Sequence, residues 1–107
     1  MALIEAFRAD GLWPPIVPSV VLVESLQGHG SRDAKANRFL KACIIEEHVW
    51  TALARRAAEL RRTLRHGSAV DSLVVALAEP GGTVLTGDRQ DIEALAFNSR
   101  GVSVELI

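Results

Sequence analysis

Apolar residues recur along the chain at two spacings, and the change of spacing separates predicted helices from predicted strands. Spacings of three and four predict helices over residues 2–9, 20–26, 32–42, 47–66, 68–79 and 91–97. Short apolar or alternating runs predict strands at IV (16–17), CIIEE (43–47), TVLT (83–86) and VSVELI (102–107). Strands that alternate with helices through short connections favour one α/β domain over residues 1–107, with three layers and a mostly parallel sheet.

Turn-forming and capping residues predict where the main helices begin and end. Gly67 follows the longest predicted helix as its natural stop, and Pro80 closes the apolar run that begins at Ser68. Ser31 and Ser68 stand at the positions where an N-cap is expected. The helix over residues 20–26 has almost no polar positions, which predicts burial on most of its sides.

The amino-acid composition restricts the class of protein but does not indicate a function. Apolar residues make up 49% of the 107 residues, charged residues 23%, and the formal net charge is −1. No apolar stretch approaches the roughly 18 residues of a membrane span, and the chain does not begin with a secretion signal, so we expect a soluble, cytoplasmic protein. Cys43, between apolar neighbours, is expected to be a buried hydrophobe. Binding to nucleic acid would require a local basic patch, because the bulk charge does not favour it.

Candidate chemistry rests on carboxylates, each of which also has an ordinary structural explanation. Glu24 stands alone in the apolar segment SVVLVESL, where it reaches the helix edge, pairs with an arginine or faces a shared polar cleft. Asp71 follows Ser68 at the spacing of a capping box, and Asp91 follows Asp88 at the same spacing. Capping or solvation would explain each acid taken singly.

Taken together, the acids point to a metal site. In a parallel α/β sheet, ligands bind where the loops after the carboxyl ends of the strands meet, and all of these acids fall near that edge. Converging carboxylates repel one another unless a divalent cation neutralises them. Magnesium or manganese fits oxygen ligands and can activate water to attack a phosphodiester, as in metal-dependent nucleases.

Other catalytic chemistries find little support in the sequence. His29, His48 and His66 are far apart and match no zinc spacing, so we expect surface or loop positions for them. The glycines of QGHG and EPGG lack the lysine of a phosphate-binding loop, and no GxSxG elbow is present.

Three segments together resemble PIN-domain ribonucleases, particularly the bacterial VapC-type toxins. The segments are PSVVLVESL, AVDSLVVALAEPGG and TVLTGDRQDIEALA, in the order and spacing of that family. The resemblance implies that Glu24, Asp71 and Asp88 are catalytic acids that bind Mg²⁺ or Mn²⁺. It further implies Asp91 as an occasional additional ligand and Thr86 as a hydroxyl beside the metal or phosphate. Endonucleolytic cleavage of RNA, a homodimer and a small antitoxin partner are what the family predicts.

The chain departs from the family at its beginning. PIN domains start with a central strand that ends in an aspartate, whereas Met1 here stands where the connection after that strand is expected, which suggests N-terminal truncation. Asp10 precedes Gly11 and is better explained as a turn residue. A missing central strand would leave backbone groups of its neighbours unpaired, so we expect repair by rejoining of the sheet, exchange between chains or a higher oligomer.

Five arginines on the longest predicted helix form a candidate phosphate-binding surface: Arg55, Arg56, Arg61, Arg62 and Arg65. A solvated helix face explains them equally simply, and Arg55 and Arg62 are the candidates for substrate contact. Two main hypotheses follow: an endoribonuclease weakened by loss of one acid, or an inactive PIN remnant that serves as an oligomerisation or antitoxin-binding module. A third possibility is a generic α/β fold whose acids only cap helices.

Overall fold

The computed structural model describes residues 6–8, 13–64, 67–87 and 89–106. Strands and helices alternate along most of this part of the chain, as predicted for the α/β class. The strands are β1 (Ala6–Arg8), β2 (Ile16–Pro18), β3 (Ile44–Glu46), β4 (Thr83–Thr86) and β5 (Ser103–Leu106). The helices are α1 (Val20–Ser25), α2 (Ala34–Lys41), α3 (Thr51–Arg62), α4 (Ala69–Ala78) and α5 (Arg89–Phe97).

The strands form one five-stranded sheet in the order β3-β2-β1-β4-β5. β2 pairs with β3 in parallel, β4 pairs with β5 in parallel, and β1 is antiparallel to both of its neighbours. The expectation of a mostly parallel sheet was therefore wrong at the centre, and the sheet is mixed. Because β1 alone runs the other way, β2, β3, β4 and β5 all end at the same edge, which we call the carboxyl edge.

β1 lies where the sequence predicted a helix. The helix over residues 2–9 was wrong for Ala6–Arg8, and the remainder of that prediction lies outside the described residues. Phe7 pairs with Ile16 on one side and with Val84 on the other. The backbone N–H and C=O groups of β2 and β4 need hydrogen-bond partners inside the core. This requirement determines the structure of Ala6–Arg8 more strongly than the helical spacing of the apolar residues does. Within this chain, β1 thus occupies the centre of the sheet, where we had expected a gap.

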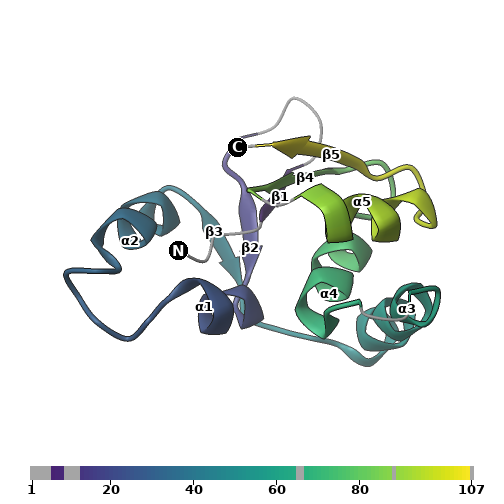
Figure 1. The fold of residues 1–107 in the computed structure, drawn as a ribbon, viewed down its shortest axis with the longest axis horizontal. Helices are drawn as coiled ribbons and strands as arrows, with labels where there is room; N and C mark the ends of the chain where they lie inside the picture. Colours follow the sequence, from purple (N-terminus) through teal and green to yellow (C-terminus); the bar gives the residue numbers. More distant parts are fainter. Residues whose placement is uncertain (1–5, 9–12, 65–66, 88, 107) are drawn as a thin grey trace.

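Helices lie on both sides of the sheet (Figure 1). In that view α3, α4 and α5 gather on one side, and α1 and α2 lie on the other. α4 packs against β1, β2 and β4 and carries the fully buried Val74 and Val75. Val84 of β4 and Leu95 of α5 complete this centre of the core.

Several helix boundaries and faces differ from the prediction. α3 begins at Thr51 rather than at residue 47, because the extended chain up to Trp50 carries the backbone from β3 to α3 on the other side of the sheet. α5 begins at Arg89, two residues earlier than expected. Asp33, not Ser31, occupies the N-cap position of α2. α1 is not buried on most sides, since Val23 is 82% exposed.

None of the described helices combines the length and the apolar character that crossing a lipid bilayer requires.

Candidate functional site

The chain brings the predicted acids toward the carboxyl edge through its connections. Ser19 links the end of β2 to α1, and its N–H donates to the carbonyl of Glu46 at the end of β3, 2.8 Å away. After α4, a tight turn closes where the Gly82 N–H donates to the Ala78 carbonyl at 2.9 Å, and β4 begins at once. The chain reverses there, so the first turn of α4 lies toward the edge at which β4 ends.

Asp71 is the most informative of these acids. It lies in the first turn of α4 and is only 8% exposed. Its N–H donates to the Ser68 hydroxyl at 3.3 Å, so the predicted serine cap is present. No described residue donates a hydrogen bond to its carboxylate, and no described Lys, Arg or His pairs with it. Within the described ranges, neither carboxylate oxygen is a fully buried atom that lacks a partner, and the helix dipole favours a negative charge in this first turn.

Glu24 and Ser25 form the end of α1 on the same edge. Glu24 is exposed and has no ion pair with any described residue, so this part of the structure places it at the helix edge. Ser25 is only 4% exposed, and its hydroxyl finds no hydrogen-bond partner within the described ranges. Sequence reasoning missed Ser25, although its spacing of four from the buried Val21 places both on the inner face of α1.

The segment after β4 holds the remaining candidates. Thr86 is the last residue of β4 and is buried. Asp91 is exposed in the first turn of α5, where a carboxylate interacts favourably with the helix dipole. Stabilisation of α5 therefore explains this acid as well as metal binding does. Asp88 lies outside the described residues, and its predicted roles as metal ligand and helix cap stay predictions.

The donor atoms at this edge suit a hard cation, but the described part of the chain does not assemble a full ligand set. Carboxylates and hydroxyls are oxygen ligands of the kind that Mg²⁺ and Mn²⁺ accept. Within residues 6–8, 13–64, 67–87 and 89–106, no three His, Cys, Asp or Glu side chains lie in a group that could hold a metal. His29 and His48 are exposed, as expected, and His66 falls outside these ranges.

Cys43 behaves as the sequence predicted in part. It is half-buried, its thiol donates to the Phe39 carbonyl at 3.3 Å, and burial raises its pKa. A thiol with a raised pKa is a poor nucleophile and a poor metal ligand at neutral pH.

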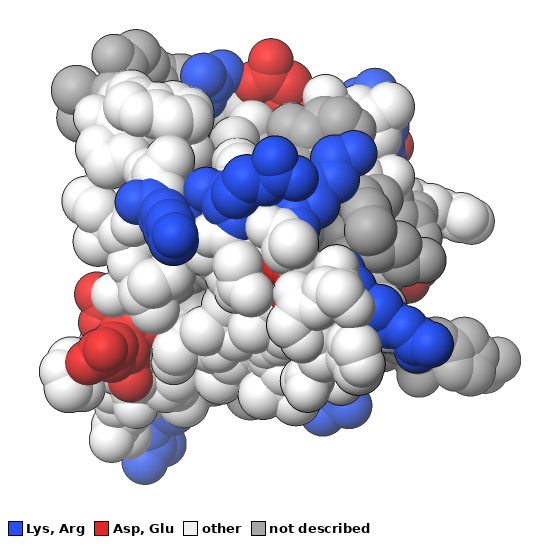
Figure 2. Space-filling model, turned by 90° about the vertical axis from the view of Figure 1, so that its left-hand side faces the viewer, with Lys and Arg blue, Asp and Glu red and all other residues white. Residues whose placement is uncertain are grey.

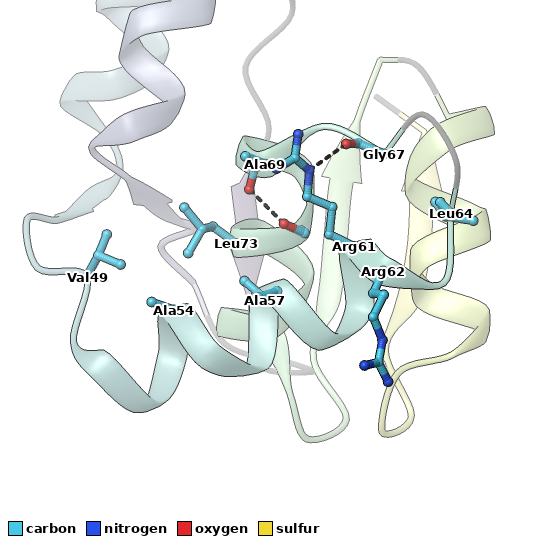
Figure 3. Close-up of a pocket in the computed structure, with 11 residues that line it drawn as sticks. Val49, Ala54, Ala57, Arg61, Arg62, Leu64, Gly67, Ala69 and Leu73 are labelled. Atoms are coloured by element: carbon cyan, nitrogen blue, oxygen red, sulfur yellow. Dashed lines mark hydrogen bonds between the residues drawn. The ribbon is translucent and has the colours of Figure 1, made fainter.

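A groove of about 760 Å³ lies between α3 and the first turns of α4 (Figure 3). Small and apolar residues form much of its wall, among them Ala54, Ala57 and Leu73. Arg61 extends toward the loop before α4, where its Nε donates to the Gly67 carbonyl at 2.9 Å, and Arg62 points away from α4 (Figure 3). Ser72, the neighbour of Asp71, also lines the groove, which therefore begins beside the carboxyl edge.

The predicted arginine surface of α3 is interrupted at Arg56. Arg55 and Arg62 are exposed, but Arg56 turns inward and binds Glu79 through two hydrogen bonds of 2.7 and 2.8 Å. These bonds hold the pKa of the Glu79 carboxyl below its ordinary value. Arg56 is therefore neutralised inside the fold and is not available for phosphate, and Arg65 is not among the described residues.

A second basic surface lies on α2 and was missed. Its exposed residues, which we call the α2 basic face, are Lys35, Arg38 and Lys41 of α2 together with Arg32 in the turn before the helix. Figure 2 shows Lys and Arg side chains in a band across the face of the molecule on which α2 lies. The signal was present in the sequence as a cation at every third position, but the longer run of arginines in α3 drew the prediction there.

Comparison of the chain with protein-family models, with curated proteins and with solved structures finds no match. Its function must therefore be argued from the residues at the carboxyl edge.

Proposed function

We propose that the chain is a metal-dependent endoribonuclease of the PIN type, close to the VapC toxins, which cleaves RNA phosphodiesters. The order of the three acidic segments supports this proposal, together with an α/β fold that directs them toward one edge of the sheet. The observation that carries it is Asp71, a buried carboxylate that receives no hydrogen bond from the described residues. A divalent cation is a partner that a carboxylate at this edge can accept.

In this proposal Glu24, Asp71 and Asp88 hold Mg²⁺ or Mn²⁺, with Asp91 as a further ligand. The bound ion would lower the pKa of a water molecule and stabilise charge on the phosphodiester. α4 fixes the backbone of Asp71, because Ser68 caps the helix and Val74 and Val75 anchor it in the core. The Thr86 hydroxyl lies at the end of β4, next to the acidic segment, to orient the phosphate. Arg55 and Arg62 contact the RNA backbone further away.

A second candidate is an inactive PIN remnant that acts as an oligomerisation or antitoxin-binding module. β1 favours it, because this central strand contributes Ala6, Phe7 and Arg8 to the sheet and no carboxylate. Apolar side chains that a partner could cover are exposed on two helices: Val23 on α1 and Phe97 on α5, the latter 89% exposed. Homodimers, higher oligomers with exchanged elements and an antitoxin complex all belong to this alternative.

Metal-dependent stabilisation tests the proposal without relying on cleavage. About 10 mM Mg²⁺ or Mn²⁺ should raise the melting temperature of the wild-type chain, since a ligand that binds only the folded state stabilises it by mass action. Asp71→Asn should abolish most of this rise. Glu93→Gln is the matched control, because Glu93 is an exposed acid of α5 that pairs with Arg89, and it should respond like wild type.

Cleavage of a fluorescent single-stranded RNA completes the test. The wild-type chain should cleave the RNA in the presence of Mn²⁺ and should not cleave it in EDTA. Asp71→Asn should lower the cleavage rate by at least about 100-fold. Cleavage in EDTA, or an undiminished rate in Asp71→Asn, would refute the proposal. If neither metal stabilisation nor cleavage is seen, and light scattering shows a dimer or a larger oligomer, the results support the alternative that the chain is an inactive PIN remnant.

A further inference from the structure

We propose that the α2 basic face binds the phosphate backbone of single-stranded RNA and holds it beside the carboxyl edge; the choice of RNA rests on the proposed function. The face consists of Arg32, Lys35, Arg38 and Lys41, which are all exposed. Residues three apart on a helix are surface neighbours, about 5–6 Å apart at Cβ. Lys35, Arg38 and Lys41 therefore form a row on α2, and Arg32 precedes this row in the turn before the helix.

No described acid forms an ion pair with a cation of this row. α2 itself, Ala34–Lys41, contains no acid. Asp33, at its start, is buried and accepts hydrogen bonds from the N–H groups of Gln27 and His29 at 2.8 and 3.0 Å. Every ion pair found within the described ranges uses cations other than those of the α2 basic face. Since the whole chain has a formal charge of −1, its positive charge is concentrated locally here.

The position of α2 connects this face with the candidate site. In Figure 1, β4 and β5 point toward the side of the molecule on which α2 lies. The band of Lys and Arg in Figure 2 crosses the surface seen from that side. The α2 basic face and the ends of β4 and β5 therefore lie toward the same side of the molecule (Figure 1).

The apolar side of α2 argues for a nucleic acid rather than a membrane surface. Ala36, Phe39 and Leu40 are partly buried and pack against the core. A helix that lies in a membrane interface must insert its apolar face into the lipid, and in α2 that face is already used. What α2 presents outward is charge, which suits the phosphate backbone and gives binding with little dependence on sequence.

Binding of a fluorescein-labelled oligouridylate in EDTA tests this inference apart from any cleavage. Fluorescence anisotropy over about 50–200 mM salt yields the affinity and the salt dependence, whose slope is about 0.7 for each phosphate contacted on a single strand. The triple variant Lys35→Gln, Arg38→Gln, Lys41→Gln should bind at least about tenfold more weakly at the low-salt end and lose about two units of slope.

Single substitutions provide a matched control. Arg38→Gln should reduce the affinity severalfold, whereas Arg100→Gln, which removes the same charge from an exposed arginine before β5, should not change it. Circular dichroism should be the same for all variants, because each substituted side chain is exposed. Equal losses in the two single variants would mean that only net charge matters, and would overturn the inference.

Two further outcomes separate this inference from the proposed function. Asp71→Asn should bind the oligonucleotide like wild type in EDTA, so failure of cleavage with intact, α2-dependent binding contradicts the nuclease alone. Unchanged binding in the triple variant contradicts the α2 basic face alone. Binding to phosphatidylserine vesicles that depends on α2, without binding to the oligonucleotide, would identify a membrane partner and overturn the inference.

Discussion

Two carboxylates lie at opposite ends of α4 and differ in the hydrogen bonds that they accept. Glu79, directly after the last residue of the helix, accepts hydrogen bonds from Arg56 Nε at 2.7 Å, Arg56 Nη2 at 2.8 Å and the Arg100 N–H at 2.7 Å. Asp71, in the first turn, accepts none from the described residues. Both lie largely out of solvent: the Glu79 side chain is 5% exposed, and Asp71 as a whole residue is 8% exposed.

This difference shows that donors, and not burial, distinguish a structural carboxylate from a candidate ligand. The three donors of Glu79 use its capacity to accept hydrogen bonds and join α3, α4 and the segment before β5. Asp71 keeps its capacity for a partner from outside the chain. A site residue is therefore expected to contribute less to folding than a structural residue that is buried to the same degree.

The largest expected effect is the loss of the Glu79 interactions. Glu79→Gln leaves the partly buried Arg56 with only the exposed Glu59 as an anionic partner, and breaking such a buried pair costs about 3 kcal/mol of unfolding free energy. Urea unfolding at pH 7 measures this change. Asp71→Asn, measured in EDTA, should alter the unfolding free energy by less than about 1 kcal/mol, because it removes a carboxylate that no described donor stabilises.

Glu59→Gln is the control for this comparison. Glu59 also pairs with Arg56, at 3.1 Å, but its side chain is 63% exposed, and exposed pairs contribute about 0.5 kcal/mol or less. If Glu59→Gln proved as costly as Glu79→Gln, the burial of Glu79 would not be the source of its stabilising effect. If Asp71→Asn proved as costly, Asp71 would be a structural residue.

An intermediate effect is expected from pH. The hydrogen bonds from Arg56, and then the one from the Arg100 N–H, lower the pKa of Glu79 below its ordinary value of 4.5. A lowered pKa in the folded state means that this stabilisation is complete above about pH 4.5 and is lost as the pH falls through the folded-state pKa. The difference in unfolding free energy between wild type and Glu79→Gln should therefore be constant from pH 7 to about 5 and shrink below that. A difference that stayed constant to pH 3 would contradict the assignment.

Local chemistry made most of the helices and strands predictable. Pro80 and the glycines after it end an apolar run, and Ser68 is followed by a helix whose third residue, Asp71, donates to the serine hydroxyl. These signals act over a few residues, so a sequence contains them in full. The alternation of strands and helices also predicted that the acids of the candidate site approach one edge, but within the described ranges no three of them form a group that could hold a metal.

Features that depend on distant partners were not predictable in this way. β1 is a strand because it forms backbone hydrogen bonds with β4, about 75 residues later in the chain. The three residues Ala6–Arg8 contain no local signal that predicts this pairing. Arg56 lies 23 residues from Glu79, so the sequence showed it only as one of a run of arginines. Because Arg56 binds Glu79, it does not add its charge to the surface of α3. A row of exposed cations without an ion pair to a described acid lies instead on the α2 basic face.

The smallest expected effect concerns the ion pair that joins β1 to the far edge of the sheet. Arg8 Nη2 lies 2.6 Å from Glu105 Oε2, and the two side chains are 34% and 54% exposed. Compared with the buried pair of Glu79, this exposed pair should contribute only about 0.2–1 kcal/mol, and Glu105→Gln should lower the unfolding free energy by that amount. Salt should weaken the effect, because exposed charges are screened, whereas the cost of Glu79→Gln should persist at about 0.5 M salt. Urea unfolding of both variants at low and high salt checks this contrast, and equal salt sensitivity would show that Glu79 and Glu105 stabilise the fold in the same way.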